Sequence, residues 1–243
     1  VDANSVWQTI IANAHDNAEP GILFWDNIIK ESPADCYADD GFKTVGTNPC
    51  SELPLSALDS CRLLFLPLLT YVDNAFSSKS SFNYKKFFED VKIAQRMMDN
   101  IIDLELECVQ RIIDKIDSDP ESETIKSRER DIWVRIYENC ENGRRTGLGI
   151  TALGDAVAAL GFKYGSTRCI QEVGKIYQVL KFGSYWASAE MAQELGPFPV
   201  WDWNKEKNNP FIQRIGKEKI DFGGLELDGK KLLKIIKKTG RRN

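Results

Sequence analysis

A short stretch between two prolines constrains the local fold of this 243-residue chain more than any other. It reads Thr-Asn-Pro-Cys-Ser-Glu over residues 47–52, and Pro54 follows. Each proline disfavours helical backbone at the residue before it. In an extended segment, residues two apart lie on the same face. We therefore predict a stiff, non-helical loop that presents the amide of Asn48, the thiol of Cys50 and the carboxylate of Glu52 together.

The residues around this thiol argue against two common kinds of cysteine site. A cysteine protease needs a base beside its nucleophile, and the only histidine, His15, lies well upstream. No Cys-x-x-Cys pair is present to form a zinc site, and one histidine does not complete a ligand set. A neighbouring carboxylate disfavours the thiolate. We therefore expect Cys50 to stay protonated, which is the starting state for hydrogen-atom chemistry.

The same residues resemble ribonucleotide reductase, a family that carries Asn-x-Cys-x-Glu on a loop with a redox cysteine further along. The match falls on Asn48, Cys50 and Glu52, and Cys61 lies eleven residues after Cys50. That separation resembles the adenosylcobalamin-dependent class II enzymes. Family glycine is replaced here by Ser51, which costs about 1 kcal/mol or more if the backbone there has positive φ. Further similar segments are Glu19–Asp26, Arg144–Ile150 and Gly240–Asn243.

The resemblance implies a thiyl-radical mechanism for this loop. Cys50 would become the radical that abstracts the ribose 3′ hydrogen, and Glu52 would take the proton of the 3′-hydroxyl. Asn48 would hydrogen-bond the substrate, and Cys61 would be one half of the reducing dithiol. Substrate contacts are expected from Asn48, Ser51 and Glu52. The implied activity is reduction of ribonucleoside di- or triphosphates to 2′-deoxyribonucleotides for DNA synthesis.

The resemblance also implies a cofactor and partners. The cofactor is adenosylcobalamin, whose binding site is not recognisable in this sequence, and no metal ligands are expected. Expected partners are the ribonucleotide substrate, complementary reductase segments, a thioredoxin-like or glutaredoxin-like reductant and a second copy in a homodimer. The cysteine that pairs with Cys61 is not identified, because none of the others matches it. Those others are Cys36, Cys108, Cys140 and Cys169.

Two alternatives to a class II segment stay open. One is a segment of a class I large subunit, which needs a separate radical-generating subunit. The other is a non-catalytic assembly module of a split enzyme. In each case we expect residues 1–243 to be a single partial catalytic-barrel domain from the interior of a larger reductase. The sequence does not decide among a split gene, intein flanks and a truncation.

The bulk composition is that of an ordinary soluble chain, with 42% hydrophobic and 28% charged residues. A net charge of −4 argues against a dedicated nucleic-acid binder. No apolar run approaches the ~18–20 residues of a membrane span, and no secretory signal is visible. The six cysteines lack the spacing of a disulfide scaffold. We therefore expect a cytoplasmic protein without nucleic-acid or membrane partners.

Short apolar runs alternate with long helical patterns, which predicts an α/β fold. The resemblance implies a helix-rich part of a ten-stranded α/β barrel, with a central finger loop carrying Cys50 and with exposed strand edges. We predict strands over 22–25 and 61–72, the second buried on both faces. The predicted helices cover 2–14, 26–30, 83–116, 120–142, 151–160, 167–195 and 230–242.

Several motifs have both a structural and a functional interpretation, and the structural one is favoured. The acidic residues from Asp99 to Glu107 indicate a solvated face rather than a metal site. Arg144-Arg145 fits a helix end at least as well as a phosphate site. The glycines of 147–154 indicate a tight turn into a helix. Trp201–Trp203 indicates surface packing rather than base stacking. The basic helix at 230–242 is expected to pack against a part of the enzyme outside this chain.

Overall fold

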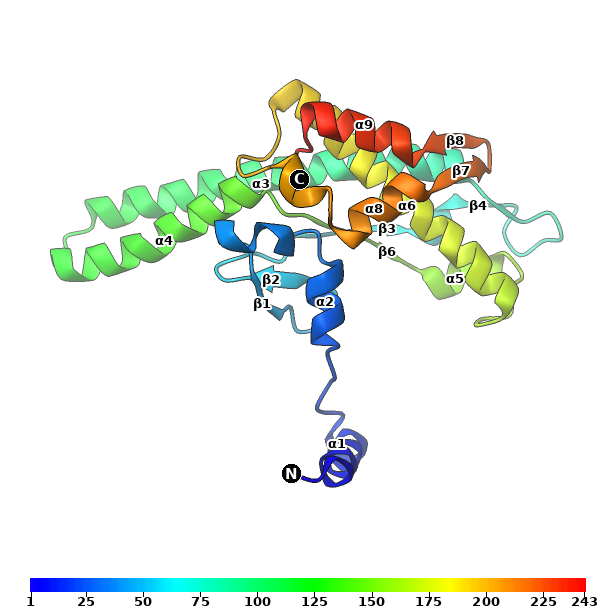
Figure 1. The fold of residues 1–243 in the computed structure, drawn as a ribbon, viewed down its shortest axis with the longest axis horizontal. Helices are drawn as coiled ribbons and strands as arrows, with labels where there is room; N and C mark the ends of the chain where they lie inside the picture. The colour runs from blue at the N-terminus through cyan, green and yellow to red at the C-terminus, as the bar shows by residue number, and fades with distance from the viewer.

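The computed structural model describes residues 1–243, and its architecture is helix-rich α/β (Figure 1). The α-helices are α1 (Ala3–Asn17), α2 (Trp25–Glu31), α3 (Tyr84–Ser118), α4 (Glu123–Gly143), α5 (Leu153–Ala159), α6 (Thr167–Leu195), α7 (Trp203–Glu206), α8 (Pro210–Lys217) and α9 (Gly229–Thr239). Two 3₁₀ helices are η1 (Asp35–Asp40) and η2 (Leu68–Tyr71). The strands are β1 (Thr44–Thr47), β2 (Pro54–Ser56), β3 (Leu63–Pro67), β4 (Val72–Asp73), β5 (Ser81–Phe82), β6 (Gly147–Thr151), β7 (Lys219–Phe222) and β8 (Leu225–Asp228).

The two longest helices begin at side-chain caps of residue types that favour this position. The Asn83 side chain accepts a hydrogen bond from the Lys86 amide at the start of α3. The Ser166 side chain does the same for the Cys169 amide at the start of α6. Such caps satisfy amides that have no partner inside the helix. The predicted bounds of α6 and the predicted end of α3 before Asp119 are confirmed.

Helices α3 and α6 pack against each other and hold the main hydrophobic core. Phe87 and Val91 of α3 are buried against Val179 and Phe182 of α6. The helices approach closely at Gly183, where an added Cβ would lie 2.6 Å from a methyl carbon of Val91. A glycine at this position therefore allows the two helices to pack closely.

The central strand pair is parallel and joins distant parts of the chain. Strand β3 pairs with β6, with Leu63 opposite Gly147 and Pro67 opposite Thr151. The prediction of one strand over 61–72 buried on both faces is wrong. Leu63 and Phe65 are 40% and 50% exposed, and η2 follows Pro67. Each strand has a single neighbour, so each has an unpaired edge, and the alternating burial along β3 shows that one face of the pair is more exposed than the other.

Two predictions about local structure are corrected by strand positions. Residues 147–151 form β6 rather than a turn, because their backbone pairs with β3; the helix that follows is α5. Residues 22–24 form no strand, because no other strand lies beside them, and Trp25 already belongs to α2.

The C-terminal region is a compact unit of α8, the antiparallel β7–β8 hairpin and α9. Leu232 and Ile236 of α9 are fully buried in the main core, beside Ile212 and Ile215 of α8. The expectation that this basic helix packs against something outside the chain is wrong. Its partners are α6 and α8, and its lysines lie on the opposite, solvated face.

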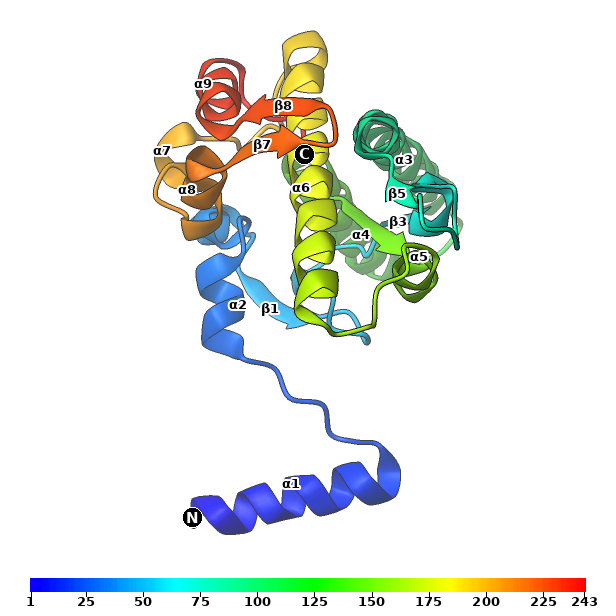
Figure 2. The same ribbon diagram turned by 90° about the vertical axis from the view of Figure 1, so that its right-hand side faces the viewer.

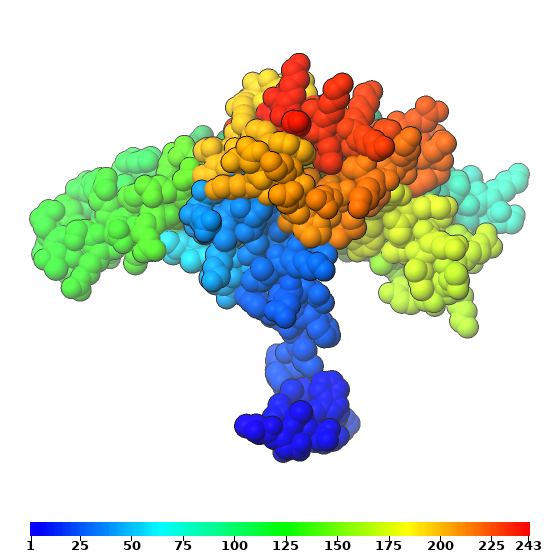
Figure 3. All heavy atoms as spheres, viewed as in Figure 1, coloured from blue at the N-terminus to red at the C-terminus, as the bar shows by residue number.

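Two parts of the molecule extend away from this core. Helices α3 and α4 form a long hairpin that projects to one side (Figures 1 and 3). Helix α1 has no buried residue and is joined to the body by an extended linker (Figure 2). Met98 is buried in the core, whereas Met97 and Ile93 are more than half exposed on the outer face of α3. None of the helices is both long enough and apolar enough to cross a membrane.

Candidate active site

Residues 48–53 form the closed end of a β-hairpin, because β1 and β2 are antiparallel neighbours on either side. The Asn48 amide donates to the Leu53 carbonyl at 3.2 Å, and Ser51 donates to the Asn48 carbonyl at 3.0 Å. The Asn48 side-chain oxygen accepts from the Leu53 amide at 2.9 Å. The segment is non-helical as predicted, but it is a turn and not an extended strand.

This turn separates the three predicted catalytic side chains by burial. Asn48 is 7% exposed, because its side chain closes the turn from inside. Cys50 and Glu52 are exposed at the tip. The oxygen of Asn48 is occupied within the turn, whereas its Nδ2 group makes no hydrogen bond within the chain. That group is therefore available as a donor toward a bound molecule.

Ser51 has a left-handed backbone with φ of 67°. A side chain in this region is strained, and glycine is the residue that adopts it without strain. The condition under which serine in place of glycine is costly, a positive φ at Ser51, is therefore met.

Cys61 lies close to the tip of the turn although eleven residues separate it from Cys50 in the chain. The pKa of the Cys61 thiol is raised, first by desolvation and then by the nearby Glu52 carboxylate, the Cys50 thiol and Asp59. The cysteine is exposed, as are Cys50 and Glu52. The structure thus brings two thiols and a carboxylate together at one surface, where they disfavour ionisation of the Cys61 thiol.

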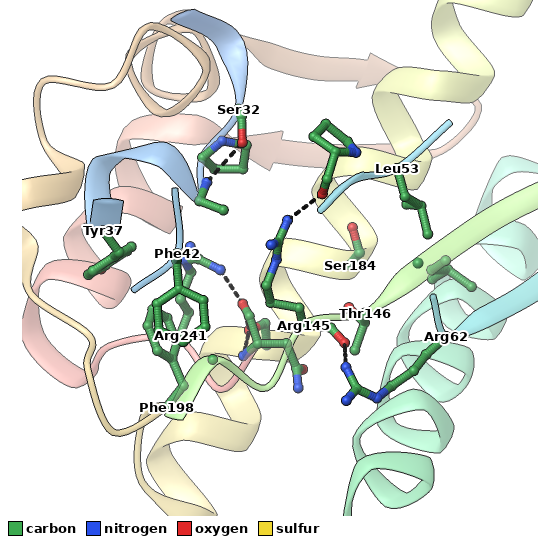
Figure 4. Close-up of a pocket in the computed structure, with 18 of the residues that line it drawn as sticks. Ser32, Tyr37, Phe42, Leu53, Arg62, Arg145, Thr146, Ser184, Phe198 and Arg241 are labelled. Carbon is green, nitrogen blue, oxygen red and sulfur yellow. Dashed lines mark hydrogen bonds between the residues drawn. The ribbon is translucent and has the colours of Figure 1, made fainter. Parts of the chain in front are cut away.

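Two arginines fasten the segments that carry these thiols. Arg62 is buried and forms an ion pair with Glu105 of α3, and its Nη1 donates to the Arg145 carbonyl at 3.0 Å. The Arg145 guanidinium bonds Asp59 Oδ2 at 2.5 Å and the Pro54 carbonyl at 2.7 Å. Figure 4 shows both guanidinium groups in the same close-up as Leu53, the last residue of the turn. Sequence reasoning placed Arg145 at a helix end and did not connect it with the cysteines.

The chain matches one protein family over its full length. The family described as "Ribonucleotide reductase, barrel domain" matches residues 1–243. The chain belongs to this family.

Relatives of this barrel domain include both cobalamin-dependent and large-subunit reductases. A "Vitamin B12-dependent ribonucleoside-diphosphate reductase" of Thermoplasma acidophilum is 28% identical over 85% of this chain and 23% of its own length. A protein of the same name from Mycobacterium tuberculosis is 24% identical over 82% of this chain and 24% of its own length. A "Ribonucleoside-diphosphate reductase large subunit" of Variola virus is 24% identical over 83% of this chain and 22% of its own length. The chain thus spans about a quarter of these relatives.

The fold of this barrel domain is also found in a solved structure. The "Actinobacillus ureae class Id ribonucleotide reductase alpha subunit" has a TM-score of 0.61 and 17% sequence identity. The match covers 98% of this chain and 39% of that chain. It supports the helix-rich α/β architecture of the ribonucleotide reductase barrel.

A cavity of about 300 Å³ lies behind the hairpin of this barrel domain (Figure 4). Leu53, Pro54 and Ser60 line it from the side of the turn, and Arg241 lines it from the C-terminal segment. None of the four predicted catalytic residues lines this cavity. The thiols therefore lie outside the cavity, although Leu53 and Ser60, which adjoin Glu52 and Cys61 in the chain, line it.

A buried ion pair borders this cavity and was not foreseen from the sequence. Glu206 is fully buried and pairs with Arg241 at 2.7 Å. Tyr37 donates to the same carboxylate at 2.9 Å, and burial beside this carboxylate raises the pKa of Tyr37 far above its usual range. The pair joins η1, α7 and the C-terminal segment, which are far apart in sequence. No local pattern announces such a contact.

The acidic residues of α3 form a second internal network. Asp99 is almost fully buried and bonds Arg144 at 2.7 Å and Arg242 at 3.2 Å. Arg144 also reaches Asp103 at 2.8 Å. The prediction of a solvated acidic face is therefore wrong for Asp99, because the residues that neutralise it come from later in the chain. Arg144 has a structural role, because it is the residue with left-handed backbone that ends α4.

Proposed function

We propose that this chain is a catalytic segment of a class II ribonucleotide reductase, working with complementary segments of the same enzyme. The observation that carries the proposal is the turn of Asn48, Cys50 and Glu52 with Cys61 beside it, in a chain of the reductase barrel family. Residues 1–243 act as one partial barrel domain. The names of the cobalamin-dependent relatives favour ribonucleoside diphosphates as substrates.

The proposed chemistry assigns one task to each side chain. Cys50, as a thiyl, takes the 3′ hydrogen of the ribose in a nearly thermoneutral, reversible step. Glu52 accepts the 3′-hydroxyl proton, which promotes loss of the 2′-hydroxyl as water. Asn48 donates from Nδ2 to the substrate and holds it for the transfer. Ser51 also contacts the substrate. Cys61 and a second cysteine outside this chain supply two electrons and become a disulfide.

We propose adenosylcobalamin as the cofactor of the complete enzyme, because the first relatives are named vitamin B12-dependent. When bound, it supplies the radical by homolysis. The residues of this chain do not fit a cobalamin site. The only histidine, His15, which is the one imidazole that the chain could offer to the cobalt, is exposed on α1, away from the thiol turn.

For the fold, we propose that β3 and β6 are two of the ten strands of a complete barrel. The β1–β2 hairpin is then the finger loop that carries Cys50 into its centre. The open edges of the parallel pair support this arrangement, since unpaired strand edges require partners. We further propose a cytoplasmic enzyme, reduced by a thioredoxin-like or glutaredoxin-like protein and able to form a homodimer.

The function is tested in the complete reductase that contains this chain. With a ribonucleoside diphosphate, a dithiol and adenosylcobalamin alone, we expect deoxyribonucleotide formation, and Glu52→Gln should reduce it at least 100-fold. A requirement for a separate radical-generating subunit would instead assign the chain to the class I large subunits, such as those named among its relatives. We expect the isolated 243-residue chain to be inactive, because a partial barrel without a cofactor site cannot generate the radical.

A further inference from the structure

Arg145 occupies the junction between the end of α4 and the start of β6, yet its side chain reaches the catalytic hairpin. One guanidinium group bonds the first residue of β2 and the turn that follows β2. Nη2 donates to the carbonyl of Pro54, two residues after Glu52, at 2.7 Å. Nη1 pairs with Asp59, two residues before Cys61, at 2.5 Å. The same planar group therefore connects the segment that carries Cys50 and Glu52 to the segment that carries Cys61.

The backbone at this junction is itself held by the residue that follows Cys61. Arg62 donates to the Arg145 carbonyl at 3.0 Å and to Glu105 Oε1 of α3 at 3.0 Å. The side chains of Arg62 and Asp59 are both 4% exposed, so these contacts are shielded from water and well defined. The clamp formed by Arg62 and Arg145 thus anchors both thiol segments to α3 and β6.

Other contacts between the two thiol segments are few. Cys50, Glu52 and Cys61 are exposed, and the Ser56 hydroxyl to Asp59 bond, at 3.3 Å, is long. Arginine is suited to hold two acceptors at once because its donors form a rigid planar fork, whereas lysine is a single point charge. A misplacement of about 1 Å at a catalytic group lowers the rate by about 100-fold.

We propose that Arg145 is a positioning residue that sets the separation between the Cys50–Glu52 turn and Cys61. This inference rests on the proposed function for its catalytic consequence, but the geometry it describes is independent of turnover. The effect of Arg145 on the reaction is exerted through Pro54 and Asp59, without contact with the substrate.

The first test uses the 243-residue chain and the pH dependence of alkylation of Cys61 by iodoacetamide, followed by mass spectrometry. Desolvation raises the pKa of Cys61 most, and Glu52, Cys50 and Asp59 raise it further, so release of the turn, which hydrates the thiol and moves Glu52 and Cys50 away, should lower its apparent pKa. We expect Arg145→Met to increase the alkylation rate of Cys61 at pH 7.5 at least threefold. Loss of the arginine charge alone would act in the opposite direction, because a lost cation disfavours the thiolate.

Matched variants separate positioning from a general loss of an ion pair. Arg130→Met removes an exposed pair with Asp117 at the tip of the α3–α4 hairpin and should leave Cys61 unchanged. The rate for the exposed Cys108 is the internal reference in every variant. In Arg145→Lys, which keeps one contact, the alkylation rate of Cys61 should lie between those of the wild type and Arg145→Met. This variant provides the test if Arg145→Met does not fold. An unchanged or slower Cys61 rate in the folded Arg145 variants overturns the proposal.

The second test uses the complete reductase. Arg145→Met should lower kcat at least tenfold with KM within threefold of the wild type, and Arg145→Lys should restore part of the loss. A kcat within twofold of the wild type overturns the catalytic part of the proposal. Activity that survives loss of the Cys50 thiol would instead overturn the proposed function, and the alkylation result would still decide the positioning.

Discussion

Ser51, in the turn that carries Cys50, has a backbone conformation that a side chain disfavours. With φ of 67°, it occupies the left-handed region that glycine tolerates best. We predict that Ser51→Gly raises the free energy of unfolding by about 0.5–1 kcal/mol, measured by urea denaturation. Ser78→Gly, at an exposed loop residue without positive φ, should instead lower it slightly. Equal effects of the two changes would contradict the strain at Ser51.

The buried pair of Glu206 and Arg241 predicts a large stability effect. Arg241→Met leaves a carboxylate with no exposed side-chain surface and no cation, so we expect a loss of about 3–5 kcal/mol in the free energy of unfolding. Arg130→Met breaks a half-exposed pair and should cost about 0–1 kcal/mol. Urea denaturation of both variants measures the difference. Losses of similar size would show that burial of the pair is unimportant.

Buried thiols predict that the chain loses stability in alkali. Burial raises the pKa of Cys140 to about 11, with Arg62 opposing part of the shift, and raises that of Cys36 to about 12. In the unfolded chain these thiols ionise near pH 9, so the unfolded state loses protons first. The contribution of these thiols to the free energy of unfolding is therefore fully present below pH 9. It is lost between pH 9 and about 11, by up to ~1.4 kcal/mol per pH unit for each thiol.

The measurement is the urea midpoint at intervals from pH 7.5 to 10. Between pH 9 and 10 the thiols dominate, because tyrosine in the unfolded chain ionises only near pH 10. Cys140→Ala should flatten the fall in this interval, whereas Cys108→Ala, at an exposed thiol, should not. An equally steep fall in Cys140→Ala would contradict the assignment.

At the scale of residues, the sequence indicates the candidate side chains of the site but not the contacts that hold them in place. The amide, thiols and carboxylate could be predicted because their types and spacing are unusual together. The closure of the turn by Asn48 and the reach of Arg145 could not, because both depend on side-chain directions in the folded chain. The buried state of Asp99 is a similar case, since its partners Arg144 and Arg242 come from two later segments.

At the scale of elements, the crossing of α3 and α6 depends on one glycine. An added Cβ at Gly183 would lie 2.6 Å from a Val91 methyl carbon, and overpacking of this kind costs about 1–3 kcal/mol. We predict that Gly183→Ala lowers the thermal unfolding midpoint, and that Val91→Ala in the same chain recovers part of the loss. Gly174→Ala, on the same helix with open space around it, should stabilise by up to about 1 kcal/mol. A gain in both glycine variants would contradict the close approach.

Helices could be predicted from the sequence better than strands. Caps at Asn83 and Ser166 are local signals, and both long helices end where the sequence indicates. Strand β6 was not recognised because its glycine-rich sequence carries little strand preference. It is a strand because β3, from a distant part of the chain, lies beside it. Exposure alternates along β3 because successive side chains point to opposite faces of the pair and one face is less covered than the other.

At the scale of the whole molecule, the chain is a reductase barrel segment that spans about a quarter of its relatives. Its thiol site is assembled from one hairpin, one following turn and two clamping arginines. Much apolar surface stays exposed, on α1 and on the outer face of α3. The family could be recognised from a few motifs, whereas the packing of α9 inside the chain could not, because an amphipathic helix does not reveal its partner.

The most direct test of the account is ribonucleotide reduction by Cys50→Ser in the complete reductase, beside Cys108→Ser as the matched control. The account predicts complete loss of deoxyribonucleotide formation in the first variant, with folding and substrate binding retained. It predicts wild-type rates in the second, whose thiol is exposed on α3. Reduction at a normal rate by Cys50→Ser would contradict it and would leave the chain as a non-catalytic assembly module.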